Sequence, residues 1–494
     1  MSKVGFDNDK YLKLQSEKIL GRAKNFGDKL YLEFGGKLFD DYHASRVLPG
    51  FEPDSKMRML LEMKDDAEIV LVISANDIEG GKLRGDLGIT YDSETLRLID
   101  TFKDLGLKVC GVCITRYAEQ KSAVLFKKHL ESLGVKVYCH YYIEDYPTNV
   151  NLIISEEGFG KNDYIETSRP LVVITAPGPG SGKMAVCLSQ LYHEFKRGIN
   201  AGYAKFETFP VWNLPLKHEV NLAYEAATAD LDDINMIDPF HLDVYGEKTV
   251  NYNRDVEIFP VLNAMFEKIY GSSPYKSPTD MGVNMVGNCI TDNEVCIEAS
   301  RREILRRYYA ATTALQKGTG KKSEVSKLEL LMKGLDLTAS ERPVIAAALK
   351  KAEETGGPAV AIELPDGEIV TGKTSSLLGA SSACLLNALK TLAGIDDEIT
   401  LIAPDVLEPI CQLKTEYFKN NNPRLHTDET LIALSICSRN DKNAAATMNC
   451  VDLLAGCEAH STVILSQADT SVFKKLGLNL TCEPTYQTKK LYHQ

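Results

Sequence analysis

Residues 171–197 constrain the fold of this chain more than any other stretch. An apolar run at 171–176, rich in β-branched residues, leads into the loop Pro177-Gly178-Pro179-Gly180-Ser181-Gly182-Lys183. An apolar run that ends in proline and glycine indicates a buried parallel strand. After the loop, apolar residues share one helical stripe, at positions 184, 187, 188, 191 and 195. The stretch therefore predicts a strand, a glycine loop and a helix.

The loop itself is suited to bind an anion. Because Gly178, Gly180 and Gly182 have no side chains, the backbone can turn sharply there and direct several N–H groups inward. The helix that begins at the loop adds the positive end of its dipole, and Lys183 adds a full positive charge. Together with Ser181, these residues are the predicted contacts of a phosphate-bearing cofactor.

This loop matches the phosphate-loop pattern G-x-x-x-x-G-K-[ST] only in part. Placed over residues 177–184, the pattern fits at its last glycine and its lysine, but Pro177 replaces the first glycine and Met184 replaces the Ser or Thr. That missing hydroxyl normally binds the magnesium of the nucleotide. Ser181, Thr175 or a carboxylate would have to take its place.

Two acidic residues are the predicted magnesium ligands. Asp77 follows a predicted strand at 68–74, and Glu156 follows a predicted strand at 150–154. Acids at the carboxyl ends of parallel strands can meet at one edge of the sheet. The same polar segments also contain Glu79, Asp86 and Glu157. For any one of these acids, a solvated or helix-capping role is the alternative.

The glycines also allow a dinucleotide site. Gly178-x-Gly180 followed by Gly182 is one residue short of the dinucleotide fingerprint, and Glu207 ends the next predicted strand, at 203–208, where an acid could bind a ribose hydroxyl. The third glycine is misplaced for this pattern. NAD or NADP therefore ranks behind ATP with magnesium as the predicted cofactor.

His241 is the predicted general base. It lies in a polar segment, at about 209–290, that is rich in Asn, Asp, Pro and aromatic residues. We interpret this segment as loops and short helices inserted at the carboxyl edge of the sheet. A histidine can act as a base near neutral pH, and a structural histidine is the alternative.

The strands and helices alternate through the first part of the chain. Strands are predicted at 29–34, 68–74, 108–115, 135–141, 171–176 and 203–208, with helices between most of them. This alternation predicts an α/β fold with a doubly wound, mostly parallel sheet over residues 1–316. A linker at 317–323 would separate it from a C-terminal α/β or α+β domain at 324–494, with a hairpin at 358–371 and strands at 398–402 and 462–465.

Composition limits the partners. The chain has 494 residues and a formal net charge of -12, which argues against a broad electrostatic contact with nucleic acid or an anionic membrane. No stretch is apolar enough to span a bilayer. The twelve cysteines are scattered through apolar runs, which indicates reduced thiols in the core and no disulfide framework. We expect a cytoplasmic protein with a small anionic ligand, and the sequence leaves open whether it forms a homo-oligomer.

Motifs of other enzyme classes are absent. Cys110 and Cys113 form a C-x-x-C within an apolar strand, where residues three apart point to opposite faces, so core cysteines are expected. The chain has neither H-E-x-x-H nor G-x-S-x-G, and a peptidase is unsupported. Arg302 and Arg306 share a face of a predicted helix at 293–315 and could contact phosphate, or simply face solvent.

Three blocks of the chain, at 76–86, 173–183 and 277–284, resemble a bacterial family of uncharacterised proteins, a domain-of-unknown-function family sometimes labelled ATP-dependent peptidase. The resemblance extends over nearly the whole chain. It implies a conserved cytoplasmic protein with a phosphate-loop-like N-terminal domain, and it supplies no established reaction.

The sequence therefore predicts an ATP-binding enzyme of ligase or phosphoryl-transfer type that acts on a small polar substrate. In this hypothesis Lys183 neutralises charge in the transition state, and Asp77 or Glu156 helps to hold magnesium. The alternatives are an NAD- or NADP-dependent oxidoreductase and a non-catalytic sensor of a phosphate-bearing metabolite.

Overall fold

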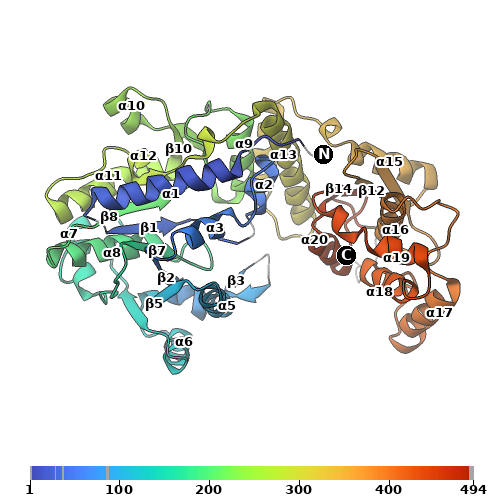
Figure 1. The fold of residues 1–494 in the computed structure, drawn as a ribbon, viewed down its shortest axis with the longest axis horizontal. Coiled ribbons are helices and arrows are strands. Elements are labelled where there is room, and N and C mark those ends of the chain that lie inside the picture. The colour runs from blue at the N-terminus through green and yellow to red at the C-terminus, as the bar shows by residue number, and fades with distance from the viewer. Residues whose placement is uncertain (1–2, 28, 36–37, 40, 85–87, 489–494) are drawn as a thin grey trace. The chain divides into compact units, whose positions relative to one another are not determined.

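The computed structural model describes residues 3–27, 29–35, 38–39, 41–84 and 88–488 (Figure 1). The chain divides into two compact units. Of the described residues, the N-terminal unit contains those at 4–225 and 233–297, and the C-terminal unit contains residue 3, residues 226–232 and residues 298–488. Each unit has its own sheet. The predicted α/β class is confirmed.

A seven-stranded parallel sheet forms the centre of the N-terminal unit (Figure 1). In spatial order its strands are β11 (Gly282–Val283), β8 (Gly202–Phe206), β1 (Leu30–Phe34), β7 (Leu171–Thr175), β2 (Ala67–Ser74), β5 (Lys108–Tyr117) and β6 (Val137–Tyr141). The central strands β2 and β7 are buried along their whole length, as expected for parallel strands covered on both faces.

Helices cover both faces of this sheet. Tyr31, Val172 and Tyr203 pack against α8 (Lys183–Lys196) and α11 (Asn253–Tyr270) in one core cluster. The connections from β1 to β2, β5 and β6 run toward one edge of the sheet, whereas those from β7 to β8 and β11 run toward the other edge. Because such connections are right-handed, the helices of the first group lie on the face opposite to α8 and α11. Those helices include α3 (Ser55–Glu62), α5 (Tyr91–Asp104) and α6 (Lys121–Ser132).

The remaining elements of this unit are short, apart from α1. They are α1 (Asn8–Asn25), α2 (Tyr42–Val47), α4 (Ala75–Glu79), β3 (Leu83–Arg84), β4 (Ile89–Thr90), α7 (Val150–Ile153), α9 (Glu219–Ala227), β9 (Asn235–Ile237), α10 (Pro239–Tyr245), β10 (Val250–Tyr252) and α12 (Pro278–Met281). The long helix α13 (Asn293–Gln316) begins in this unit and continues into the C-terminal unit.

Two predictions for the N-terminal unit need correction. Residues 150–153 form the short helix α7, and no strand is present at 150–154, because a short, mainly apolar segment fits a helical turn as well as a strand. The insertion at 209–290 is more regular than predicted, since it contains the 18-residue helix α11, which has Pro260 within it.

The C-terminal unit is built on a mixed four-stranded sheet. Its strands, in spatial order, are β13 (Ile369–Lys373), β12 (Ala359–Glu363), β14 (Glu458–Ser461) and β15 (Asn479–Cys482). The predicted hairpin at 358–371 is present as β12 and β13. Its helices are α14 (Lys322–Gly334), α15 (Pro343–Thr355), α16 (Ala380–Leu392), α17 (Pro404–Gln412), α18 (Thr427–Cys437), α19 (Lys442–Met448) and α20 (Gln467–Lys475).

Three boundaries in this region differ from the predictions. Residues 398–402 form no strand, and the strand predicted at 462–465 lies earlier, at β14. Residues 317–321 form a turn, but most of α13 already belongs to the C-terminal unit, where Arg306 pairs with Glu458. The arginines of α13 are therefore engaged by carboxylates within that unit.

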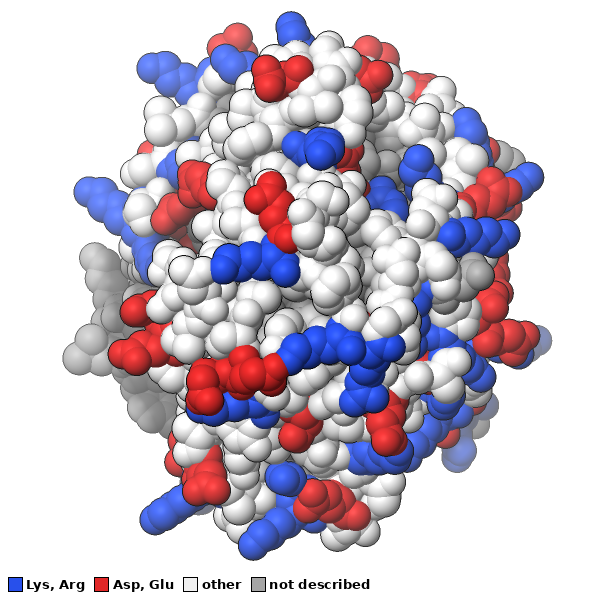
Figure 2. Space-filling model, turned by 90° about the vertical axis from the view of Figure 1, so that its left-hand side faces the viewer, with Lys and Arg blue, Asp and Glu red and all other residues white. Residues whose placement is uncertain are grey.

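Charges of both signs are interspersed over the face shown in Figure 2, which has no broad patch of one sign. In the part of the chain that the structure describes, no helix has the length and apolar character needed to cross a membrane.

Candidate functional site

The glycine loop lies at the carboxyl edge of the parallel sheet, between β7 and α8. Strand β7 is flanked by β1 and β2, whose connections leave toward the face opposite to α8. Connections that diverge in this way open a crevice at the strand ends, and open α/β sheets bind ligands in such crevices. The topology therefore places the predicted loop at the expected binding position of the fold.

The loop has a defined shape. Gly180 and Gly182 have φ angles of 77° and 90°, in the left-handed region that favours glycine. The buried hydroxyl of Ser181 donates to the carbonyl of Gly178 at 2.8 Å, and the Thr115 hydroxyl donates to the carbonyl of Ser181 at 2.6 Å. Two carbonyl groups of the loop are thus held by the protein's own hydroxyls.

The backbone amide groups of the loop, unlike these carbonyl groups, have no partners among the described residues. Among the described residues, no protein atom accepts a hydrogen bond from the N–H groups of 180–182 or of the first three residues of α8, 183–185. Pro179 and Gly180 are exposed, so the loop is open to solvent. Free N–H groups at the start of a helix of this length attract anions. The loop therefore has the donors that a phosphate group requires.

Lys183 is the first residue of α8 and is half-buried. Its charge and that of Glu33 both act on Cys187, one turn further along α8: burial and Glu33 raise the pKa of this thiol, and Lys183 opposes them. A cation and a carboxylate therefore lie close to the first turns of this helix.

Glu33 is an acid that the sequence reasoning missed. It lies near the end of β1, opposite Ile174 of β7 in register, and its carboxylate accepts a hydrogen bond from the Tyr203 hydroxyl at 2.7 Å. The signal was present in the sequence, because Glu33 is the one acidic residue in the predicted strand 29–34 and comes just before its end.

Asp77 lies close to the loop. It belongs to α4, directly after β2, and its Oδ1 pairs with Lys82 Nζ at 3.2 Å. Lys82 Nζ is also 3.5 Å from the carbonyl oxygen of Pro179, and it lies over the ring of Tyr91. The other carboxylate oxygen of Asp77 is buried and has no hydrogen-bond partner among the described residues. An unpaired buried carboxylate oxygen beside an anion site fits a bound cation.

Glu207 is engaged elsewhere. Burial raises its pKa although Lys205 lies 2.9 Å away, and its other oxygen accepts from the Trp212 indole N–H at 3.2 Å. Lys205 also pairs with Asp255 at the start of α11. Because β1 separates β8 from β7, Glu207 is not at the strand next to the glycine loop. This position does not fit the ribose contact of a dinucleotide.

Glu156 and His241 are not brought to the loop. Glu156 contacts Tyr192 and Lys196 in the last turns of α8, roughly 14 to 20 Å along the helix axis from the loop at 1.5 Å per residue. His241 Nδ1 lies 2.9 Å from the Ser277 hydroxyl within the insertion. Glu79 accepts from the amide of Ser122, and Asp86 lies outside the described residues.

Together, these features define an α/β protein with a glycine-rich turn at the switch point of a parallel sheet and a separate C-terminal unit. The chain belongs to the DUF1846 family. Residues 4–336 match the N-terminal part, described as "Domain of unknown function DUF1846, N-terminal", and residues 340–492 match the C-terminal part.

Relatives with full-length similarity are bacterial. The chain is 58% identical over 494 residues to a UPF0371 protein of Streptococcus thermophilus and 58% identical to one of Streptococcus sanguinis. It is 57% identical to a UPF0371 protein of Streptococcus pneumoniae. Each comparison covers 100% of both chains. The predicted membership of an uncharacterised bacterial family is confirmed.

Proposed function

We propose that this protein is an enzyme that binds ATP with magnesium at the glycine loop and transfers a phosphoryl group, or forms a ligase-type bond, on a small polar substrate. The observation that carries the proposal is the row of six consecutive N–H groups, 180–185, at the switch point of the sheet, to which the described residues offer no acceptor. Neutral, fixed donors of this kind bind phosphate oxygens without any rearrangement.

Each nearby residue has a role in this proposal. The amide groups hold the phosphates, and Lys183 balances the charge that develops on them during transfer. Asp77, through its unpaired oxygen, and Glu33, next to β7, would hold magnesium in place of the hydroxyl that Met184 lacks. Magnesium, when bound, would neutralise and orient the phosphate oxygens.

A dinucleotide cofactor has less support in this geometry. Its acidic ribose partner, Glu207, pairs with Lys205 and Trp212 and lies two strands away from the loop strand β7. A metabolite sensor would use the same amide groups without turnover. These two possibilities are outcomes of the test below.

ATP binding should stabilise the N-terminal unit, and Lys183→Ala should remove most of that effect. At a hundredfold excess over Kd, a ligand stabilises by about 2.7 kcal/mol. Loss of one charge-assisted contact should weaken binding about 10- to 100-fold. The fluorescence of Trp212, the only tryptophan, reports thermal unfolding of this unit with ATP, ADP, NAD and NADP.

Lys196→Ala is the matched control, because Lys196 lies at the far end of the same helix. Equal ATP stabilisation in the natural chain and in Lys183→Ala would contradict the proposal, and selective stabilisation by NAD would favour the oxidoreductase. Binding of ATP without turnover across a metabolite panel would identify a sensor.

Asp77→Asn should abolish the magnesium dependence of ATP binding and leave magnesium-free binding nearly unchanged. A neutral amide is a poorer ligand for a hard dication than a carboxylate. Isothermal titration with ATP, with and without magnesium, measures the difference. Glu79→Gln in the same short helix is the control, since Glu79 accepts from the amide of Ser122. Unchanged magnesium dependence in Asp77→Asn would show that another group holds the ion.

A further inference from the structure

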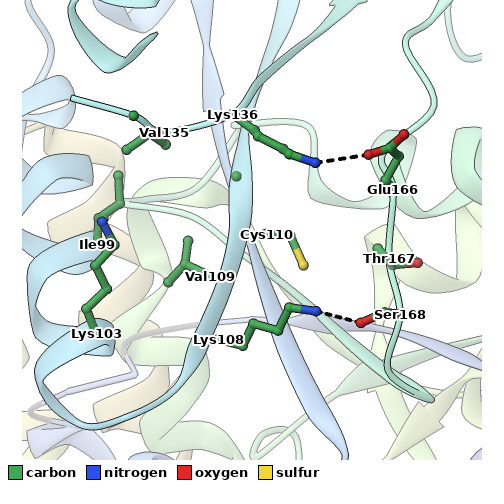
Figure 3. Close-up of a pocket in the computed structure, with 12 residues that line it drawn as sticks. Ile99, Lys103, Lys108, Val109, Cys110, Val135, Lys136, Glu166, Thr167 and Ser168 are labelled. Carbon is green, nitrogen blue, oxygen red and sulfur yellow. Dashed lines mark hydrogen bonds and ion pairs between the residues drawn. The ribbon is translucent and has the colours of Figure 1, made fainter. Parts of the chain in front are cut away.

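A pocket lies at the opposite edge of the parallel sheet from the glycine loop. It has a volume of about 460 Å³ and is formed where β5 begins, by the end of α5, the turn before β6 and the segment 166–168 before β7 (Figure 3). This volume is in the range of small-molecule sites. Because all strands are parallel, amino-terminal ends meet here, and the pocket is separate from the proposed nucleotide site.

An irregularity of β5 creates this pocket. Ile69 pairs with Val109 and Val70 with Gly111, so Cys110 is an extra residue in the strand. On its other side, β5 pairs with β6 only from Val112 onward. Gly111 is required at this point, since a Cβ there would lie 2.5 Å from the carbonyl oxygen of Lys136. Residues 108–111 therefore have β2 as a partner on one side and the pocket on the other.

Three lysines from three elements surround the pocket. Lys103 comes from α5, Lys108 from the start of β5 and Lys136 from the turn before β6. In Figure 3, Lys108 and Lys136 reach toward the segment 166–168, where Lys108 Nζ lies 2.5 Å from the Ser168 hydroxyl and Lys136 Nζ lies 3.0 Å from Glu166. Ile99, Val109 and Val135 supply an apolar part of the lining.

The charges of the pocket leave an excess of one positive unit. Among the described residues, two of the three lining lysines form ion pairs: Lys136 with Glu166, and Lys108 with the buried Glu68 at 2.9 Å, while Lys103 has no carboxylate partner. Burial alone would raise the pKa of Glu68, but hydrogen bonds from the Arg169 amide and from Lys108 lower it, so Glu68 stays ionised. One negative charge on a ligand would balance the site.

Two side chains define what the pocket can do. Burial and the neighbouring Glu68 raise the pKa of the Cys110 thiol to about 12, so the thiol is protonated and is a poor nucleophile. The Lys136–Glu166 pair is well exposed, with side-chain accessibilities of 65% and 71%, and such pairs are weak. Lys136 can therefore turn to a ligand at low cost, and the pocket suits binding better than covalent chemistry.

We propose that this pocket binds a small monocarboxylate with a short branched apolar chain, held by Lys103 and Lys136 and packed on Ile99, Val109 and Val135. A carboxylate matches the single excess charge, whereas a dianionic phosphate would exceed it. The apolar side chains fit a chain of a few carbon atoms.

Isovalerate is the probe, with acetate, isovaleramide and inorganic phosphate for comparison. Titration of the full chain, followed by NMR or calorimetry, should give saturable isovalerate binding with a Kd in the millimolar range, as expected for a small ligand held by exposed lysines. Acetate and isovaleramide should each bind at least about tenfold more weakly, because one lacks the apolar chain and the other the charge.

The double variant K103Q/K136Q should weaken isovalerate binding at least about tenfold, and K128Q, an exposed lysine of α6 outside the pocket, should leave it unchanged. Both substitutions are at exposed positions, so the fold is kept. Absence of saturable binding, equal binding of isovaleramide, tighter binding of phosphate or an unaffected double variant would each overturn the proposal. ATP binding to the double variant should be unchanged, which separates this site from the glycine loop.

Discussion

Replacing Glu458 with alanine is expected to lower the free energy of unfolding of the C-terminal unit by about 3–5 kcal/mol. Glu458 lies in β14 and is almost fully buried. Its carboxylate pairs with Arg306 at 2.9 Å and with Arg342 at 2.7 Å, and Arg342 is fully buried. Removal of the carboxylate leaves the Arg342 guanidinium buried without its counter-charge, and this cost exceeds the cavity term.

Hydrogen exchange measured by mass spectrometry locates this effect. Protection should fall in β12 and β14 and stay unchanged in β1 and β7, which belong to the other unit. Glu353→Ala, at an exposed position of α15, is the control and should change stability by no more than about 0.5 kcal/mol. If β14 in Glu458→Ala is protected from exchange as strongly as in the natural chain, the ion cluster contributes little to the stability of this unit.

The same carboxylate gives the stability a pH dependence. Burial would raise the pKa of Glu458, but Arg306 and Arg342 outweigh burial and lower it below the ordinary 4.5. Because the folded pKa is lowered, the contribution of this group is complete above about pH 4.5 and is lost as the pH falls through the lowered pKa. The acid limb of the unfolding curve of Glu458→Ala should therefore be flatter than that of the natural chain.

The glycine loop was predictable because its evidence is local. An apolar run, a glycine-rich turn and a helical stripe follow one another within 171–197, and β7 and α8 have the predicted positions. The alternating strands of the N-terminal unit were predictable for the same reason, since parallel strands buried on both faces have continuous apolar sequences.

The strand β14 shows where local evidence ends. Its sequence is Glu-Ala-His-Ser, which is too polar for a predicted buried strand. The polar side chains are buried because distant residues pair with them: Arg342 with Glu458, and Thr481 with His460 at 2.8 Å. No pattern within four residues indicates such partners, so the sequence predicted the strand at the adjacent apolar segment 462–465.

Which acidic residues lie near the loop depends on the order of the strands in the sheet, and the sequence does not give that order. Glu33 is about 140 residues before the glycine loop, yet β1 lies directly beside β7. Glu156 is close to the loop in sequence but far from it along α8. The prediction for Asp77 depended only on its place after a buried strand, and β2 is the other neighbour of β7. Its role as a magnesium ligand stays a prediction.

Gly178→Val is expected to reduce ATP affinity at least about 100-fold, or about 2.7 kcal/mol, with little loss of global stability. A Cβ at Gly178 would lie 2.1 Å from the hydroxyl oxygen of Tyr91, so the loop has to move. Movement would break the hydrogen bond from Ser181 to the Gly178 carbonyl, which holds the loop in shape. The φ angle of Gly178 is outside the left-handed region, so lack of space is the only obstacle to a side chain.

Because the obstacle is one side chain, a second substitution should remove it. The double variant Gly178→Val/Tyr91→Ala should recover ATP binding to within about tenfold of Tyr91→Ala alone, as expected when two residues in contact are energetically coupled. Calorimetric titration of the four proteins, with circular dichroism to verify folding, completes the double-mutant cycle. If Gly178→Val binds ATP as the natural chain does, the loop does not carry the nucleotide. If the double variant fails to recover binding although Tyr91→Ala binds, the shape of the loop depends on more than the contact with Tyr91.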